Sequence, residues 1–297
     1  MPRVLKRTDN LGFQLLAFSV ITVIAFLALL PFLLLITGSF TGETEIVRRG
    51  YSLFPKEISF ESYKMIFENP QEIVRAYAVT ITVALSGTLT ALLLTSMTAY
   101  VLARRDFKYR NFFALMIFFT SMFYAPLVAN YIYTVYVLRL KNNPLVYLVG
   151  GLLSPWYVLI MRNFIKTLPE ELIEAAKIDG ANDVYIYVRI ILPLLKPALA
   201  TVGLFVALGY WNDWSTTMLY IDIPKYYGLQ YYLYRIINSQ KAVERMIAMG
   251  GSAIPPALPT QAIKMAMAVV TIGPIVFLYP FLQRFFVKGL TVGAIKG

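Results

Sequence analysis

Six long apolar segments alternate with shorter polar segments along the chain. A helix that crosses the hydrocarbon core of a bilayer needs about 20 predominantly apolar residues. The segments that reach this length are residues 13–38, 76–102, 112–138, 145–165, 197–221 and 262–284. The first is longer than the apolar region of a signal peptide and has no small-residue cleavage site after it, so we interpret it as a retained helix. The pattern predicts an all-α polytopic membrane protein with six transmembrane helices.

The composition agrees with this fold class and limits the chemistry. Of the 297 residues, 58% are hydrophobic and 14% are charged, whereas soluble domains carry about 25% charged residues. The chain has no cysteine and no histidine, which excludes thiolate nucleophiles, imidazole acid–base catalysis and Cys/His zinc sites. It also lacks a G-x-x-x-x-G-K-[ST] phosphate-binding loop. We therefore expect no catalytic residues, no metal and no cofactor.

The positive charges predict the orientation of the chain in the membrane. The net charge is +11, but the basic residues lie in short loops and do not form a patch interleaved with aromatic residues, which argues against a nucleic-acid partner. Clusters precede the first apolar segment, follow the second and follow the sixth; they contain Arg3, Lys6, Arg7, Arg104, Arg105, Lys108, Arg110, Arg284, Lys288 and Lys296. Lysine and arginine collect on the cytoplasmic side. Both termini are therefore expected to be cytoplasmic.

One charged segment, residues 168–179, interrupts this apolar chain between the fourth and fifth predicted spans. The sequence TLPE, which starts at Thr167, matches a capping box with proline in the first helical turn. Gly180 fits the left-handed position that ends a helix. Asn182 then fits the cap of a second helix that runs to Pro193. The pattern predicts two short cytoplasmic helices joined by a glycine turn.

The first of these helices has two possible roles. Its smallest side chains fall on one helical face, and its charged side chains point elsewhere; the face contains Leu168, Leu172, Ala175 and Ala176. Such a face can bind in a groove of another protein. The alternative is an amphipathic helix that lies on the lipid surface. Its acidic residues would be repelled by anionic lipid headgroups, which favours docking to a protein.

The segment EAAKIDGANDVYIYVRIILP resembles the signature of binding-protein-dependent ABC importer permeases. The signature reads Glu-Ala-Ala, three residues, Gly, nine residues, Ile, one residue, Leu-Pro, and this chain matches it without a gap from Glu174 to Pro193. The resemblance implies that residues 168–179 form the coupling helix, which sits in a cleft of the ATP-binding subunit. The residues expected to couple to that subunit are Glu170, Glu171, Glu174, Ala175, Ala176, Asp179 and Gly180.

The resemblance covers nearly the whole chain and is to the carbohydrate family, in particular to the smaller permease of the maltose type. The segment WNDWSTTMLYIDIPKYYGLQ is most similar to the branch for complex oligosaccharides and polysaccharide fragments. The implied fold is a type I ABC importer permease. Its implied divisions are residues 1–75, with the first helix and an external segment, the permease core 76–290, and a cytoplasmic tail 291–297.

The resemblance also implies the function and the partners. The chain would be the permease subunit of an ATP-driven importer in a bacterial cytoplasmic membrane, and it would move a carbohydrate, in particular an oligosaccharide, into the cell. A separate subunit would hydrolyse ATP. The implied partners are a second homologous permease, two ATP-binding subunits, an extracytoplasmic solute-binding protein, the lipid bilayer and the carbohydrate. The alternatives are an ion-coupled secondary transporter, an intramembrane enzyme, or an ABC permease for another solute.

The fifth predicted span contains the clearest candidates for the substrate pathway. Ionisable residues inside a span are rare and usually functional, and Asp213 lies there among aromatic and amide side chains. On a continuous helix, Tyr210, Asp213, Trp214 and Thr217 would share one face. The alternative is that Asp213 only holds the bundle together and that the tryptophans anchor the interface. The full candidate set is Tyr210, Trp211, Asn212, Asp213, Trp214 and Thr217, with Asn130 and Tyr131 as weaker candidates from the third span.

Overall fold

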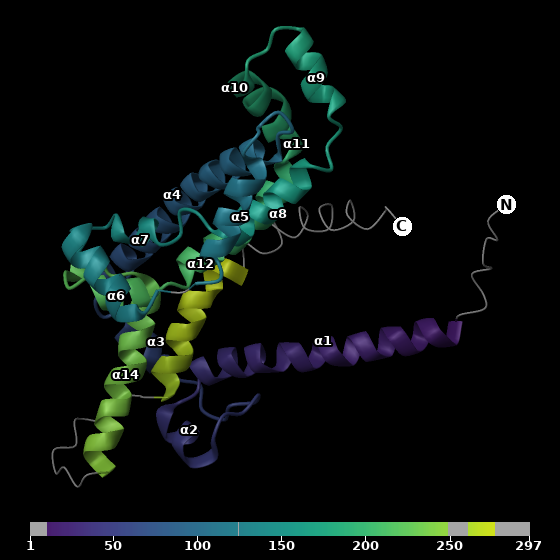
Figure 1. Cartoon of the computed structure of the whole chain (residues 1–297). Coiled ribbons are helices and arrows are strands. Elements are labelled where there is room, and N and C mark those ends of the chain that lie inside the picture. Colours follow the sequence, from purple (N-terminus) through teal and green to yellow (C-terminus); the bar gives the residue numbers. More distant parts are fainter. Residues whose placement is uncertain (1–10, 124, 249–260, 277–297) are drawn as a thin grey trace. The chain divides into compact units, whose positions relative to one another are not determined.

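The computed structural model describes residues 11–123, 125–248 and 261–276. Within these ranges the elements are helices, and the isolated bridge between Thr41 and Ile58 is the pairing of extended backbone. The described residues form two compact units. One contains the residues up to Pro70 together with Ile236–Gly273, and the other contains Gln71–Arg235 with residues 274–276. Figure 1 shows the helices.

The first unit contains the N-terminal helix and an adjoining segment held by carboxylates. The carboxylate of Glu43 accepts hydrogen bonds from the backbone N–H groups of Gln261 and Ala262, where the last described helix begins. A carboxylate at this position complements the positive end of the helix dipole. The helices of this unit are α1 (Leu11–Ser39), α2 (Glu43–Arg49), α3 (Glu61–Ile66), the later part of α14 (Leu229–Ala248) and Gln261–Val276.

The second unit is arranged around one long helix, α4 (Pro70–Ala103). The short helices α9 and α10 lie beyond one end of α4, and α6 and α7 lie near its other end (Figure 1). The remaining elements follow in chain order: α5 (Arg110–Thr120), α6 (Leu127–Ile132), η1 (Tyr133–Val137), α7 (Val146–Val149), α8 (Pro155–Ile165), α9 (Glu171–Ile178), α10 (Asp183–Tyr185), η2 (Ile186–Ile191), α11 (Leu192–Leu194), α12 (Lys196–Trp211), α13 (Ser215–Tyr220), η3 (Pro224–Tyr226) and the start of α14.

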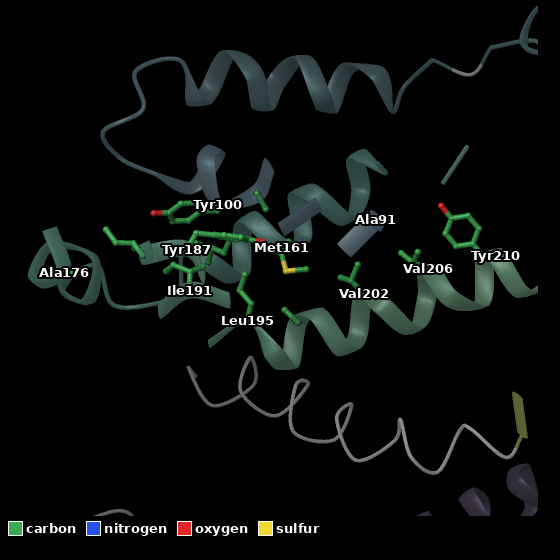
Figure 2. Packing of buried hydrophobic residues seen from close by; sticks show 14 of the residues in the cluster. Ala91, Tyr100, Met161, Ala176, Tyr187, Ile191, Leu195, Val202, Val206 and Tyr210 are labelled. Atoms are coloured by element: carbon green, nitrogen blue, oxygen red, sulfur yellow. The ribbon is translucent and has the colours of Figure 1, made fainter. Parts of the chain in front are cut away.

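The main apolar cluster of this unit connects its two ends. It begins with Ala176 of α9 and Tyr100 of α4, continues through Ile191 and Leu195, and reaches Tyr210 at the end of α12 (Figure 2). Interiors of this kind are close-packed, so a displacement at one end is felt by its neighbours. The fold thus joins α9 to the end of α12 through continuous contacts.

The structure confirms two of the predicted spans as long apolar helices, Gly12–Ser39 and Pro70–Ala103. A third apolar span, which overlaps the prediction at 197–221 only in part, is present if the bent pair Asp183–Leu194 and Lys196–Trp211, whose axes differ by 79°, forms one span. The predicted spans 112–138, 145–165 and 197–221 are interrupted, whereas the helix Gln261–Val276 covers the described part of the span predicted at 262–284. Pro126 precedes α6, and Pro155 begins α8, and a helix seldom continues into the residue before a proline.

Candidate coupling helix and transport pathway

The C-terminal end of α9 is the best-defined feature of the predicted coupling segment. Gly180 has φ +79°, a conformation that only glycine adopts without a steric penalty. The N–H of Ala181 donates to the carbonyl oxygen of Ala176 at 2.9 Å, and the N–H of Gly180 donates to that of Lys177 at 3.0 Å. These two bonds form a Schellman motif. The predicted glycine stop is confirmed.

The second predicted cap is also confirmed. The side-chain oxygen of Asn182 accepts a hydrogen bond from the N–H of Tyr185 at 2.8 Å, so Asn182 caps the helix that starts with α10. This helix continues as η2 and α11 to Leu194, one residue beyond the predicted end at Pro193. The two short helices and the glycine turn between them are therefore present.

The predicted capping box at the start of α9 is wrong. The hydroxyl of Thr167 donates to the carbonyl oxygen of Phe164 at 2.7 Å, and the N–H of Leu168 donates to that of Ile165 at 3.0 Å. These residues therefore still belong to the turn that ends α8. The helix begins at Glu171, and its N-cap residue Glu170 makes no side-chain cap hydrogen bond.

The predicted small-residue face of α9 is split between the interior and the surface. Ala176 is buried and packs with Leu168 against the core, so Ala176 is not available to a partner. Leu172 and Ala175 are exposed, and Ile178 is 85% exposed. The spacing of these three residues places them on one helical face. We call Leu172, Ala175 and Ile178 the outer face of α9; the sequence analysis did not include Ile178.

The remaining predicted coupling residues surround this outer face. Glu171, Glu174 and Asp179 are exposed, and Glu170 is half-buried. Glu170 forms an ion pair with Arg105 at 2.6 Å. The loop after α4, the end of α8 and one side of α9 also border a cavity of about 840 Å³. Polar contacts with the loop therefore support α9 on this side.

A second ion pair joins the loop after α4 to α9. The ammonium group of Lys177 donates to Asp106 at 2.6 Å. Hydrogen bonds from Arg104 and Lys177 hold the pKa of the Asp106 carboxyl well below its ordinary value. Asp106 is thus a carboxylate with two cationic partners. Arg104 and Arg105 entered the sequence prediction only as indicators of orientation, because their partners Asp183 and Glu170 are distant in the sequence.

The fifth predicted span is interrupted where its polar residues lie. α12 ends at Trp211 and α13 begins at Ser215. The carboxylate of Asp213 accepts hydrogen bonds from the N–H of Thr216 and the hydroxyl of Ser215, both at 3.0 Å. The prediction that Asp213 shares one continuous helical face with residues 210, 214 and 217 is therefore wrong. Asp213 instead satisfies one backbone donor and one hydroxyl at the start of α13.

Three of the predicted pathway residues are buried: Tyr210, Trp211 and Thr217. The ring of Tyr210 lies between two glycines, because a Cβ atom at Gly87 or at Gly151 would come within 2.6 Å of it. The hydroxyl of Tyr210 donates to the carbonyl oxygen of Leu148 at 3.1 Å. Tyr210 is therefore a packing residue in this conformation.

The remaining predicted pathway residues lie nearer the surface. Asn212, Trp214 and Asn130 are exposed, and Asp213 is half-buried. Tyr131 is half-buried and stacks on the ring of Tyr220, with centroids 5.7 Å apart. Only Asn212, Asp213 and Trp214 are brought together, and they occupy the break between α12 and α13.

The start of α14 contacts this break and adds residues that the sequence analysis did not single out. The rings of Trp214 and Tyr234 stack with their centroids 4.3 Å apart, and Tyr234 stacks in turn on Tyr231 at 6.1 Å. The amide of Gln230 donates to the side-chain oxygen of Asn212 at 3.0 Å. We call these five residues the aromatic–amide cluster. The repeated tyrosines in LQYYLYR were the sequence signal that could have indicated these additional residues.

The comparisons with known proteins assign the family. Residues 87–292 match the family model described as binding-protein-dependent transport system inner membrane component. The match covers most of the chain and includes α9, the glycine turn and the break in the fifth predicted span. The chain belongs to this family of membrane permeases.

Curated relatives align with this chain along nearly their whole length. LplC of Bacillus subtilis is 35% identical over 272 residues, which are 91% of this chain and 90% of the relative. The polygalacturonan/rhamnogalacturonan transport system permease YtcP of Bacillus subtilis is 33% identical over 288 residues, 97% and 99% of the two chains. The arabinooligosaccharide permease AraQ of Halalkalibacterium halodurans is 30% identical over 277 residues, 92% and 93%.

A solved structure has the same fold. One chain of the crystal structure of a bacterial ABC transporter involved in the import of the acidic polysaccharide alginate superposes with a TM-score of 0.79 and 25% identity. The match covers 96% of this chain and 100% of that chain. The protein is therefore a permease subunit of an ABC importer, and this result argues against an ion-coupled secondary transporter and an intramembrane enzyme.

Proposed function

We propose that the chain is the six-span permease subunit of a carbohydrate importer and that α9 docks into an ATP-binding subunit on the cytoplasmic side. The observation that carries the proposal is the construction of α9. Its inner residue Ala176 packs into the core, while its outer face exposes apolar side chains that end in the 85% exposed Ile178. An exposed apolar helix face flanked by charges suits a groove in another protein.

The proposed mechanism uses the apolar core as the link between the two ends of the second unit. A solute-binding protein delivers the carbohydrate to this chain and a second homologous permease. ATP binding brings two ATP-binding subunits together and displaces α9. The motion passes through the cluster from Ala176 to Tyr210, because packed cores transmit displacement. ATP hydrolysis by those subunits then resets the pair. This chain itself performs no chemistry.

The docking proposal can be tested by placing a charge on the outer face of α9. We expect Ile178→Asp to abolish co-purification of the ATP-binding subunit with the permease, because the groove would have to bury an unpaired carboxylate. Phe54→Asp is the matched control, since Phe54 is also 85% exposed and lies on the predicted external segment. Equal recovery of the ATP-binding subunit with both variants would disprove docking through α9.

We propose that the substrate is an oligosaccharide and that the aromatic–amide cluster lines its path on the extracytoplasmic side. YtcP is named for polygalacturonan and rhamnogalacturonan, and AraQ for arabinooligosaccharides, which supports the substrate class. Aromatic rings offer flat apolar faces to sugar C–H groups, and amides bind hydroxyls. Trp214 is 39% exposed and so can offer part of its ring to a ligand.

The substrate proposal needs two measurements. A binding screen of the matching solute-binding protein against neutral and acidic oligosaccharides identifies the cargo; binding of a non-sugar solute alone would contradict the proposal. Uptake by Trp214→Ala should then fall while ATP-binding subunit recovery stays normal. Trp156→Ala is the control, because Trp156 is 68% exposed and lies outside the cluster. Equal uptake by the two variants would remove the cluster from the pathway.

We also propose that both termini are cytoplasmic and that the permease core comprises residues 76–290. The basic clusters beside the predicted span ends support this topology. Because the chain has no cysteine, single cysteines can be labelled without a background. An impermeant maleimide added to intact cells should label Phe54→Cys and leave Ile178→Cys unlabelled; the reverse pattern would overturn the orientation.

A further inference from the structure

Arg104 stands out among the charged residues of the second unit. It is the first residue after α4, and its side chain is 9% exposed. Within the described ranges it is the one charged residue among the buried side chains. A buried guanidinium is stable only when its donors have partners. The partners of Arg104 therefore show what the surrounding structure is arranged to hold.

Those partners lie on α4, on the following loop and on α10. Nη1 donates to the hydroxyl of Tyr100 at 2.6 Å and to the carboxylate of Asp183 at 2.8 Å. Nε donates to Asp106 at 2.9 Å, and Nη2 bonds to the other oxygen of the same carboxylate. The pair with Asp106 is thus bidentate, which fixes the plane of the guanidinium as well as its position.

Asp106 extends this arrangement to α9, because Lys177 donates to its carboxylate at 2.6 Å. Arg104 therefore contacts both helices of the coupling segment: Asp183 of α10 directly, and Lys177 of α9 through Asp106. Gly180 lies between these two attachment points. Gly180 itself has no side chain, and apart from its two chain neighbours no atom lies within 4 Å of where its Cβ would be.

Contacts near Arg104 also attach the end of α4 to η2, the continuation of α10. Tyr100 and Tyr187 lie with their ring centroids 5.5 Å apart, and the hydroxyl of Tyr187 is 2.7 Å from that of Ser96. The end of α4 is therefore rigidly packed against η2. A force applied to α9 can either bend the turn at Gly180 or move α4, and the ion pairs of Arg104 oppose the bending.

We propose that Arg104 is a positioning residue for energy coupling: it fixes the angle between α9 and α10 against the end of α4, so that displacement of α9 moves α4. The proposal rests on the proposed docking of the ATP-binding subunit at α9. Arg104 itself contacts neither the substrate nor, in this account, the ATP-binding subunit. Its loss uncouples ATP hydrolysis from transport without preventing docking.

The test measures uptake per ATP hydrolysed by the complete complex in proteoliposomes with its solute-binding protein. We expect Arg104→Gln to keep the ATP-binding subunits bound and to lower uptake per ATP about tenfold, within the range of coupling changes at residues that link two sites. Lys108→Gln is the control, because Lys108 is an exposed cation on the same loop. A wild-type ratio for Arg104→Gln would overturn the proposal.

A second variant keeps the proposal testable if Arg104→Gln does not fold. Asp183→Asn removes the negative charge that attracts Arg104, at a side chain that is 70% exposed, so its effect on folding is small. Uptake per ATP should fall in this variant too, whereas a merely structural role of Arg104 would leave the ratio unchanged in every complex that assembles. A wild-type ratio in Asp183→Asn overturns the proposal even if Arg104→Gln does not assemble.

The Ile178→Asp variant separates this proposal from the proposed function. If Ile178→Asp retains the ATP-binding subunit and normal uptake, docking through α9 is wrong, and the present proposal falls with it. If Ile178→Asp loses the ATP-binding subunit while Arg104→Gln and Asp183→Asn couple normally, only the positioning role of Arg104 is wrong.

Discussion

The two polar regions of the second unit are held in opposite ways. The proposed coupling segment, which consists of α9 and α10, lies beyond the end of α4 and is held by ion pairs from the following loop, through Arg104, Arg105 and Asp106. The break between α12 and α13 follows Tyr210, whose ring fills a space between two glycines. The first region is held by ion pairs in addition to the packing of Ala176, whereas the second follows a residue that is fixed by close packing.

This difference separates the region proposed to transmit motion from the ATP-binding subunit from the region proposed to line the substrate path. Ion pairs near a surface hold a direction while their members remain partly hydrated, as the 53% exposed side chain of Asp106 illustrates. A close-packed ring such as Tyr210 cannot move unless its neighbours move too. We therefore expect changes at the coupling segment to alter coupling first, and changes around Tyr210 to alter stability first.

The largest loss of stability is expected where packing is closest. Gly87→Ala adds a Cβ atom 2.6 Å from the ring of Tyr210, and such overpacking costs about 1–3 kcal/mol. Thermal unfolding of the purified permease in detergent measures this loss. Gly209→Ala is the control, because nothing lies within 4 Å of the added atom there. Equal unfolding temperatures for both variants would show that Tyr210 is not confined.

A smaller loss is expected at the glycine turn. Alanine at position 180 must adopt φ +79°, which costs about 1–2 kcal/mol for a residue with a Cβ. Gly180→Asn should lose less, because asparagine tolerates this conformation. Recovery of the ATP-binding subunit should decrease from wild type to Gly180→Asn and further to Gly180→Ala. Full recovery with Ala would mean that α9 docks without the turn.

The cap of α10 should contribute less than the turn. Asn182→Ala removes the acceptor for the N–H of Tyr185, and the loss of an N-cap typically costs about 1 kcal/mol. Asn182→Asp keeps an acceptor and serves as the control. Hydrogen exchange of the Tyr185 amide measures the effect directly; unchanged exchange in Asn182→Ala would contradict the assigned cap.

The smallest effect is expected from pH. The lowered pKa of Asp106 means that its ion pairs contribute stability above the ordinary carboxyl pKa and lose it only as pH falls through the lowered value. Asp106 should therefore stay ionised between about pH 8 and pH 5, and its protonation should not lower the wild-type ratio of uptake to ATP hydrolysed in this range. Asp106→Asn should lower the ratio equally at both values. A wild-type decrease that Asp106→Asn abolishes would show that the carboxylate protonates in this range.

Short-range sequence signals predicted the α9–α10 segment better than the break between α12 and α13. Gly180 and Asn182 act on backbone groups within five residues, so the sequence alone indicated both caps. Thr167 also had the right spacing for a cap, but the end of α8 takes its hydroxyl. The long apolar helices α1 and α4 were predictable from composition for the same local reason, whereas the breaks at Pro126, Pro155 and Asp213 were missed because the apolar runs continue across them.

The contacts that the sequence did not reveal are the distant ones. Arg104 and Asp183 are 79 positions apart, and Trp214 meets Tyr234 only because α14 returns to the break. A continuous helix through residues 210–217 was the expectation for an apolar run, but α12 ends at Trp211, and Asp213 accepts a hydrogen bond from the N–H of Thr216 at the start of α13. Family membership, in contrast, followed from one ungapped motif and is confirmed by the match over residues 87–292.

The most direct test of the account asks whether the ATP-binding subunit covers Ile178. Single-cysteine variants Ile178→Cys and Phe54→Cys are prepared in the full complex, and maleimide labelling is measured in detergent with and without the ATP-binding subunit. We expect the subunit to protect Ile178→Cys and to leave Phe54→Cys equally reactive. Equal labelling of Ile178→Cys with and without the subunit would contradict docking through α9.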